Sequence, residues 1–399
     1  MRTSRKGLVM AAGAIGLAGA LTVASFVAPN RASAARRTYV PDTAATIVAH
    51  VPPRDAREIS EREALAAAPD RVELAVELAR VEIQRARSLS DPRYLGRAQA
   101  LLASWWKLPS PPPDVLLLRA TIEQSLHQFD AARADLDQLI AERPDDVQAH
   151  LTRAVVATVR ADYAAARESC AALQELASPG VAATCQAPLD ALAGDVDGAY
   201  GRLAAALDPR TPASFRAWAR TTLAELAIQR GDDELAASHL EAVLAVDPDD
   251  AYARAALADI VVVTDPHATS ELLDGYEQID NLLVRRAIAE TRAHGPKAAE
   301  LAGMMRDRIS AAAVRGDRVH MREEAMFTLA VEADPTRALA LAKENWGVQK
   351  ELADARLLAE CAVEARDPGA AQPVVDWVRA TGVHDARLER WLARLEDPR

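Results

Sequence analysis

Residues 113–146 read PDVLLLRATIEQSLHQFDAARADLDQLIAERPDD, and residues 147–180 read VQAHLTRAVVATVRADYAAARESCAALQELASPG. The second stretch aligns with the first without a gap, at a constant offset of 34 residues. Small, aromatic and apolar positions coincide in the following pairs: Ala120 with Ala154, Phe129 with Tyr163, Ala132 with Ala166, Leu136 with Cys170, and Leu139 with Leu173. A fixed period of this length is typical of a repeat array, in which each unit packs only on its neighbours.

The two stretches resemble the tetratricopeptide repeat, a unit of two antiparallel helices. The first unit carries the residue types that the family prefers at Ala120, Phe129, Ala132, Leu136, Ile140 and Pro144. A further unit, residues 217–250, matches at Leu223, Ala224, Gly231, Asp232, Ala236, Leu240, Leu244, Asp247 and Pro248. The resemblance implies an all-α fold, a right-handed α-solenoid of antiparallel helix pairs. In such a superhelix the small residues lie where the first helix of a unit crosses the second.

Other segments fit the repeat less closely. Residues 180–209 fit, but Pro188 predicts a kink or a restart in their first helix. Residues 251–279, 319–351 and 352–384 are divergent units, and residues 392–399 predict a capping helix. We therefore divide the chain into 1–37, a signal peptide or membrane anchor; 38–53, a linker; 54–112, divergent N-terminal helices; 113–279, the core repeats; and 280–399, divergent C-terminal repeats with the capping helix.

The amino-acid composition agrees with a helical array and limits the classes of molecule that the protein can bind. Aromatic residues make up 4% of the chain, and the 22 prolines fall largely between helical patterns, where they act as stops. The net charge is −11, although residues 1–37 contain only basic charged residues, so the remainder is more acidic still. An acidic surface repels phosphate backbones, and we expect no nucleic-acid partner.

The first 37 residues have the pattern of a targeting segment. A basic start, MRTSRKG, precedes an uncharged apolar run from Leu8 to Ala28, and Ala32-Ser33-Ala34 matches a cleavage site. The run is long enough to span a bilayer, so both a cleaved signal and an uncleaved anchor remain open. Either one predicts an exported protein, periplasmic or anchored to the inner membrane, with the membrane touched only through this segment.

No catalytic or metal-binding motif stands out. The sequence has no G-x-S-x-G, no phosphate-binding loop, no C-x-x-C and no H-E-x-x-H. Acidic pairs such as Asp145-Asp146, Asp232-Asp233 and Asp249-Asp250 lie between predicted helices, where we expect them to cap the next helix. We expect no enzyme activity, no cofactor and no metal.

Two of the three cysteines lie on consecutive predicted helices. Cys170 belongs to the second helix of one unit and Cys185 to the first helix of the next, so a disulfide between them is geometrically allowed, and export would permit it. The alternative is a pair of small buried apolar residues. Cys361, on a late helix, is expected to be a buried free thiol.

Family members bind extended peptides on the concave face, which the first helices line. The resemblance places a candidate groove at Leu117, Thr121, Gln124, Leu151, Val155, Thr158, Trp218, Thr221 and Glu225. The Lys and Asn with which one subfamily grips a carboxylate are replaced by Leu117, Thr121, Leu151 and Val155, so that clamp is absent. This nearly uncharged lining suits an apolar peptide or helix, and equally suits packing by the ends of the chain itself.

The sequence therefore favours a non-catalytic scaffold or assembly factor of the cell envelope that binds a protein or peptide partner of unknown identity. The alternative is a module that binds a small ligand or a cell-wall fragment in a pocket of the superhelix.

Overall fold

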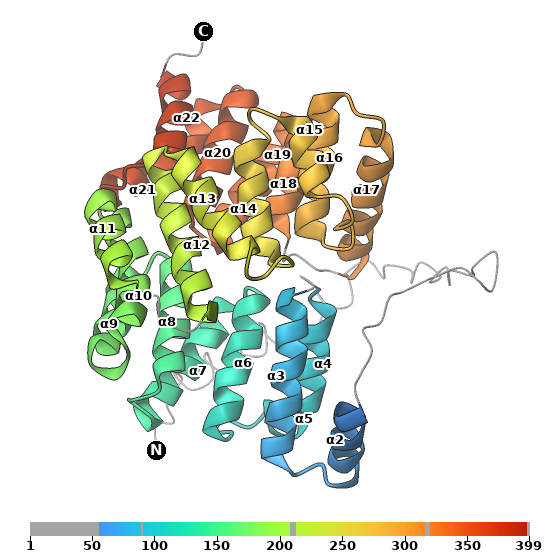
Figure 1. Cartoon of the computed structure of the whole chain (residues 1–399), viewed down its shortest axis with the longest axis vertical. Coiled ribbons are helices and arrows are strands. Elements are labelled where there is room, and N and C mark those ends of the chain that lie inside the picture. Colours follow the sequence, from blue (N-terminus) through green and yellow to red (C-terminus); the bar gives the residue numbers. More distant parts are fainter. Residues whose placement is uncertain (1–55, 89–90, 208–212, 316–319, 397–399) are drawn as a thin grey trace, which may run out of the picture. The chain divides into compact units, whose positions relative to one another are not determined.

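The computed structural model describes residues 56–88, 91–207, 213–315 and 320–396, and within these ranges it contains helices and no strand (Figure 1). The predicted targeting segment and linker lie outside the described residues. The described residues form one compact unit. None of the described helices is both long enough and apolar enough to span a membrane. The predicted all-α solenoid is confirmed.

The helices pack in consecutive antiparallel pairs, each with a first and a second member. The first helices are α3 (Val72–Ser88), α6 (Pro113–Ser125), α8 (Val147–Val159), α10 (Pro179–Leu192), α12 (Ala213–Arg230), α14 (Ala251–Val261), α16 (Asp280–Ala293), α18 (Met321–Ala330) and α20 (Leu352–Glu364). The second helices are α4 (Arg93–Leu101), α7 (Phe129–Glu142), α9 (Tyr163–Leu176), α11 (Val196–Ala206), α13 (Asp233–Leu244), α15 (Pro266–Leu272), α17 (Ala298–Arg315), α19 (Pro335–Val348) and α21 (Gln372–Thr381).

Four further elements complete the described chain. They are α2 (Ala56–Ala67), which packs on α3; the short α5 (Ala103–Trp106); the 3-10 helix η1 (Pro368–Ala371) before α21; and α22 (Ala386–Glu396), the last helix.

One turn geometry recurs between the two helices of a pair. The residue two positions before the second helix is left-handed, with φ of 59° at Ala161, 80° at Gly231 and 53° at Ala333. The next residue is an aspartate whose side chain accepts a hydrogen bond from a backbone amide of the helix that follows, as Asp162 does from Ala165 and Asp232 from Leu235. These aspartates satisfy amides that a helix start leaves without partners. The capping role expected of Asp146, Asp232 and Asp250 is confirmed.

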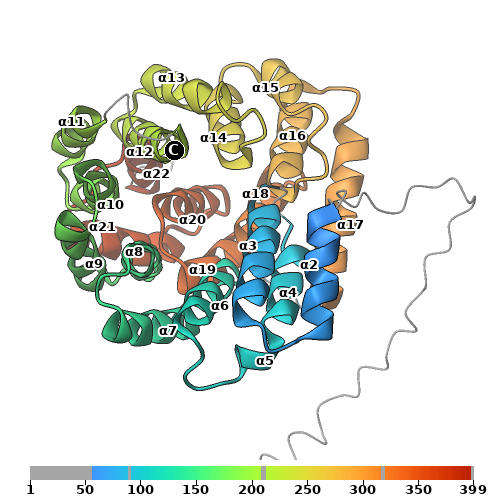
Figure 2. The same cartoon turned by 60° about the horizontal axis from the view of Figure 1, so that its bottom comes forward.

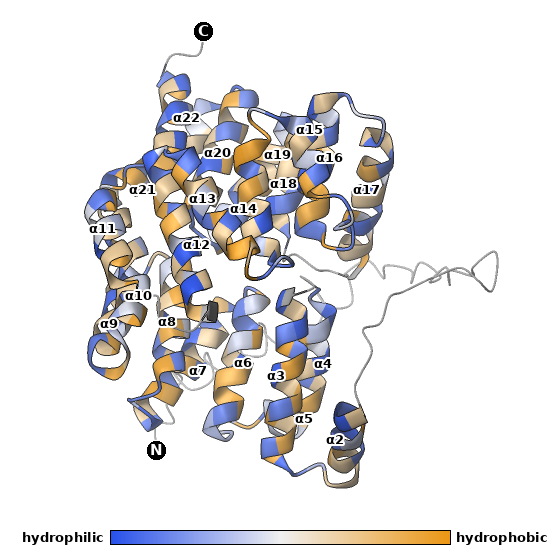
Figure 3. Cartoon of the chain, viewed as in Figure 1, coloured by the Kyte–Doolittle hydropathy of each residue, from blue (hydrophilic) through white to orange (hydrophobic). Residues whose placement is uncertain are grey.

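The small residues of the repeat pattern are buried where the helices of a pair meet. Ala120, Ala132, Ala224 and Ala236 have no exposed surface, and Ala154 is also buried. Alanine at these positions lets the helix backbones approach closely, so the apolar stripes of the two helices can pack together. Figure 3 shows hydrophobic and hydrophilic residues alternating around most helices, the pattern of amphipathic elements packed on one side.

Of the kink or restart expected at Pro188, the restart is wrong, because α10 runs from Pro179 to Leu192 as one helix with Pro188 inside it. Proline removes one backbone hydrogen bond from a helix. Packing against α9, α11 and α12 holds α10 on three sides, and a disulfide ties it to α9 through Cys185. We attribute the intact helix to these tertiary contacts.

Candidate functional site

The first helices of the C-terminal half close into a ring. Contacts join α14 to α16, α16 to α18, α18 to α20, α20 to α22, and α22 back to α12. The last junction, α12 to α14, includes a hydrogen bond from the Tyr252 hydroxyl to the Glu225 carboxylate. We call these six helices the inner ring. In Figure 2, α13, α15 and α17 lie outside α12, α14 and α16.

The ring closes through α22 and the turn before it. The Gln229 side chain on α12 donates hydrogen bonds to the carbonyl oxygens of His384 at 2.7 Å and Ala191 at 3.2 Å. Arg387 on α22 pairs with Asp233 at 2.7 Å. Gly194 also approaches this seam closely, since a Cβ there would lie 2.9 Å from the carbonyl oxygen of Gly382. The C-terminal helix thus does more than cover the last repeat, because it docks on α12.

A second seam joins the earlier repeats to the later ones. The Lys350 amide donates to the carbonyl oxygen of Val159 at 2.8 Å, and Arg160 donates to that of Val348 at 2.9 Å. Trp377 Nε1 donates to the Tyr163 hydroxyl at 2.7 Å. The turn between α8 and α9 therefore abuts the turn between α19 and α20, and the superhelix contacts itself along its length.

The structure separates the candidate groove residues by exposure. On α6, Leu117 and Thr121 are buried, and the Thr121 hydroxyl donates to the Leu117 carbonyl oxygen at 2.7 Å. Gln124 on α6 is half-buried. Leu117 and Thr121 therefore offer little surface to a partner protein.

On α8 and α12 the same family positions are more open. Val155 is 47% exposed and Trp218 is 38% exposed, although both are large apolar side chains. Leu151, Thr158 and Thr221 are half-buried, and the hydroxyls of Thr158 and Thr221 donate to backbone carbonyls of their own helices. Glu225 is exposed and faces Tyr252 of α14.

Sequence reasoning missed a network of charged side chains on the inner ring. Arg322 of α18 pairs with Asp354 at 2.6 Å and also with Glu351, while Asn345 donates to Asp354 at 2.7 Å. Arg285 of α16 donates two hydrogen bonds to Asp259 of α14, at 2.8 and 2.7 Å. The residues that meet here come from different repeats and share no sequence spacing. A neutral groove was expected from α6, α8 and α12, whereas the later first helices are charged.

Two carboxyl groups of this network hold their protons unusually tightly. Enclosure by protein raises the pKa of Glu225 to about 7; Glu351 adds to the rise, while Tyr252 and Arg356 oppose it. Burial likewise raises the pKa of Glu360 to about 7, against the opposing charge of Arg292. Water reaches Glu225 at the surface of the ring, so solvent moderates the effect there.

Carboxylates outnumber guanidinium groups in this network. The acidic members are Glu225, Asp259, Glu323, Glu351, Asp354, Glu360, Glu364 and Asp385. The basic members are Arg285, Arg292, Arg322, Arg356 and Arg394. The field on the inside of the ring therefore favours cations.

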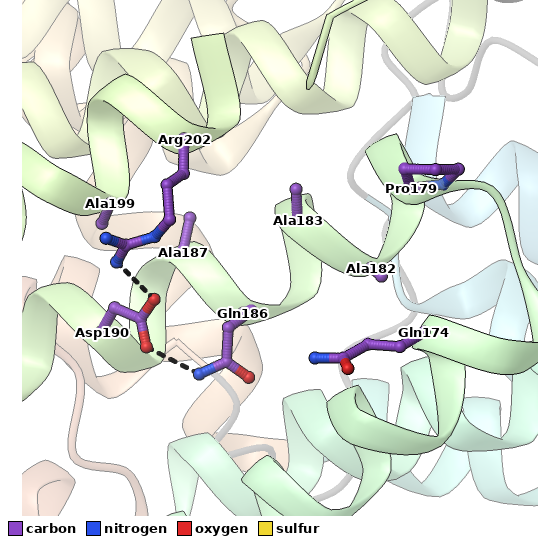
Figure 4. Close-up of a pocket in the computed structure, with 9 residues that line it drawn as sticks. All are labelled: Gln174, Pro179, Ala182, Ala183, Gln186, Ala187, Asp190, Ala199 and Arg202. Atoms are coloured by element: carbon purple, nitrogen blue, oxygen red, sulfur yellow. Dashed lines mark hydrogen bonds and ion pairs between the residues drawn. The ribbon is translucent and has the colours of Figure 1, made fainter. Parts of the chain in front are cut away.

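A shallow pocket of about 320 Å³ lies elsewhere, between α9, α10 and α11 (Figure 4). Alanine side chains form much of its wall. Its acid, Asp190, accepts hydrogen bonds from Gln186 at 2.7 Å and Arg202 at 2.6 Å. These polar groups satisfy one another, so they do not converge on an empty point where a small ligand would bind.

The three cysteines have distinct environments. A disulfide joins Cys170 of α9 to Cys185 of α10, with their Cα atoms 5.5 Å apart. Cys361 of α20 is buried and free, and burial, together with the nearby Glu360 and Glu364, raises the pKa of its thiol to about 12. That thiol stays protonated and unreactive near neutral pH. In the described parts of the chain, no three His, Cys, Asp or Glu side chains gather as metal ligands would.

Comparison with known proteins identifies solved structures with a similar fold. No family model and no curated protein sequence matches the chain. A solved structure, the Cut9–Hcn1 hetero-tetramer of the APC/C, contains a chain that matches at 12% identity with a TM-score of 0.50, over 85% of this chain and 66% of that one. This protein thus spans less than two thirds of that neighbour's length.

Two other solved structures match with lower scores. The tetratricopeptide domain of P58(IPK) matches at 17% identity and a TM-score of 0.24, covering 82% of this chain and 97% of that one. Yeast Tom70 matches at 10% identity and a TM-score of 0.31, covering 85% and 91%. The chain has the fold of a tetratricopeptide-repeat protein. This conclusion rests on the paired helices, the recurrent left-handed turn with its aspartate cap, the buried alanines at the helix crossings and the match to the hetero-tetramer.

Proposed function

We propose that the chain is a non-catalytic scaffold of the cell envelope that holds a segment of a partner protein against its first helices. The observation that carries this proposal is the exposure of Val155, Trp218 and Tyr252, at 47%, 38% and 54%. All three residues belong to first helices, and in a tetratricopeptide superhelix the first helices line the concave face. Large side chains with apolar rings or branches that stay open to water on this face are available to a partner protein.

The placement in the envelope rests on other features. The N-terminal segment has the pattern of an export signal or anchor. The Cys170–Cys185 disulfide supports an oxidising compartment, because cytosolic thiols are kept reduced. Both features favour a body that lies outside the cytoplasm. The pocket between α9 and α11 gives the small-ligand alternative less support, since its polar groups are already paired.

A photo-crosslinking amino acid placed in the full chain in its native envelope tests the proposal. We expect an adduct with a partner protein when the probe replaces Trp218 on α12. The matched control replaces Ser238, which is exposed on the second helix α13, and it should give no such adduct. Equal labelling from both positions, or no adduct from Trp218, would contradict a scaffold that uses its first helices.

A further inference from the structure

We infer that the segment bound on the inner ring presents a basic side chain, lysine or arginine, which pairs with Glu225 between Tyr252 and Trp218. This inference rests on the proposed function and specifies the chemistry of the partner. Its basis is the difference between Glu225 and the other carboxylates of the ring.

The arginines around Glu225 are committed to other acids. Arg285 pairs twice with Asp259, and Arg322 pairs with Asp354 and Glu351. Arg356, whose charge reaches Glu225, donates to Asp385 at 3.0 Å. Among the described residues Glu225 has the Tyr252 hydroxyl as its hydrogen-bond donor and forms no ion pair. A carboxylate held in a cation-favouring field without a cation is a recognition point for one.

The side chains beside Glu225 suit a lysine or arginine. Tyr252, on the neighbouring helix, touches Glu225 and remains 54% exposed. Trp218 lies seven residues before Glu225 on α12, which places the two on the same face of the helix, two turns apart. Aromatic rings accept the long aliphatic stem of a basic side chain and attract its charge. The combination of a carboxylate that forms no ion pair with the described residues and two partly exposed rings therefore selects a cation with an apolar body.

Other partner chemistries fit less well. An acidic side chain would meet Glu225 and Glu351 with like charge. A neutral apolar segment would bury the Glu225 carboxyl without supplying a partner, which is unfavourable unless the group keeps its proton. A basic side chain removes both penalties, so charge complementarity separates the three cases.

The electrostatics give the inference a pH signature. Enclosure by protein, together with Tyr252 on α14, Glu351 at the N-cap of α20 and Arg356 on α20, sets the pKa of Glu225 at about 7. A cationic partner binds the ionised carboxylate, so binding strengthens as pH rises from 6 to 8. A partner that merely buries apolar surface there would bind better at the lower pH.

The experiment uses the full chain with the photo-probe at Trp218 and identifies the crosslinked peptide by mass spectrometry. We expect a segment of another protein with lysine or arginine within a few residues of the attachment point. Glu225→Gln should lower the adduct yield at least tenfold at pH 8. Glu241→Gln, the matched control, removes the same charge from an exposed position on α13 and should leave the yield unchanged.

A charge exchange gives an independent readout. Glu225→Lys should abolish capture of the natural segment, and replacing the basic residue of that segment by glutamate should restore it. Restoration also demonstrates that the variant is folded.

The outcomes separate the inference from the proposed function. Adducts whose segments lack a basic residue, or a yield that Glu225→Gln leaves unchanged, overturn the inference and leave the scaffold proposal standing. Adducts with a second copy, or with residues 1–55 of the chain itself, which include Arg36 and Arg37, overturn the assignment to a partner protein. No adduct from Trp218 overturns both proposals.

Discussion

Gln229 of α12 donates a hydrogen bond to the backbone carbonyl oxygen of His384, which lies 155 residues later in the chain. The same amide also donates to Ala191 of α10. One buried side chain thus joins three parts of the superhelix and holds the turn before α22 against α12.

Gln229→Ala should therefore loosen the closure of the ring. The substitution leaves the carbonyl oxygens of Ala191 and His384 without this donor and opens a small void, so we expect the free energy of unfolding to fall by about 1–3 kcal/mol. Urea denaturation measures the loss, and hydrogen exchange should rise most in α21 and α22. Gln372→Ala, on the exposed start of α21, is the control and should change neither quantity.

The sequence could not predict this contact. The repeat period identifies α6 to α9 because Ala120 and Ala154 occupy equivalent crossings, and local packing alone then dictates the helix pairs. The partner of Gln229 is a backbone carbonyl, which leaves no signature in residue type. Its position depends on the sum of small rotations between many repeats, and no single residue sets that sum.

The candidate site, too, was predictable from the sequence only in part. Glu225 could be placed on a concave face because the family pattern gives the position on the first helix. Its hydrogen bond with Tyr252 and its exposure to the charge of Glu351 follow from ring closure, which the pattern does not contain. Leu117 was assigned to the same concave face by the family pattern, yet it is buried. The pattern gives the side of the helix on which a residue lies, but it does not give the neighbouring elements that cover that side. Whether these residues bind a partner stays a prediction.

Ala236→Trp should disrupt the crossing of α12 and α13. Ala236 is fully buried against Leu240 and Ala224, so the indole would overpack the site and cost on the order of 1–3 kcal/mol or more of unfolding free energy. Thermal melting checks this. Ser238→Trp, on the exposed face of the same helix, should melt like the wild type. An Ala236→Trp variant with an unchanged melting temperature would refute the assignment of this position as a helix crossing.

Loss of the disulfide should lower stability without changing the fold. The bond links residues 15 apart in sequence, and the chain-entropy model assigns a loop of that size about 3 kcal/mol. We expect the Cys170→Ala, Cys185→Ala double variant to unfold at a lower urea concentration. Reductant should lower the midpoint of the wild type and leave that of the double variant unchanged. A reductant effect of the same size on both proteins would assign the effect to another group.

Glu123 should make stability fall as pH rises through neutrality. Burial, reinforced by the charge of Asp135 and opposed by Arg119, raises the pKa of Glu123 from 4.5 to about 7. Below pH 4.5 the carboxyl is protonated in both states. Between pH 4.5 and 7 the unfolded chain loses this proton while the folded chain keeps it, so folding becomes less favourable, and above pH 7 the full loss is present.

Glu123→Gln removes that dependence, because glutamine is neutral at every pH. The variant should match the wild type near pH 4.5 and exceed it by roughly 1–2 kcal/mol in unfolding free energy at pH 8. Urea titrations of both proteins at the two pH values give the difference. Glu142→Gln, at an exposed position at the end of α7, should give no difference at either pH. A variant less stable than the wild type at pH 8 would mean that the ionised Glu123 is stabilised by a partner, and the assigned direction of its pKa shift would then be wrong.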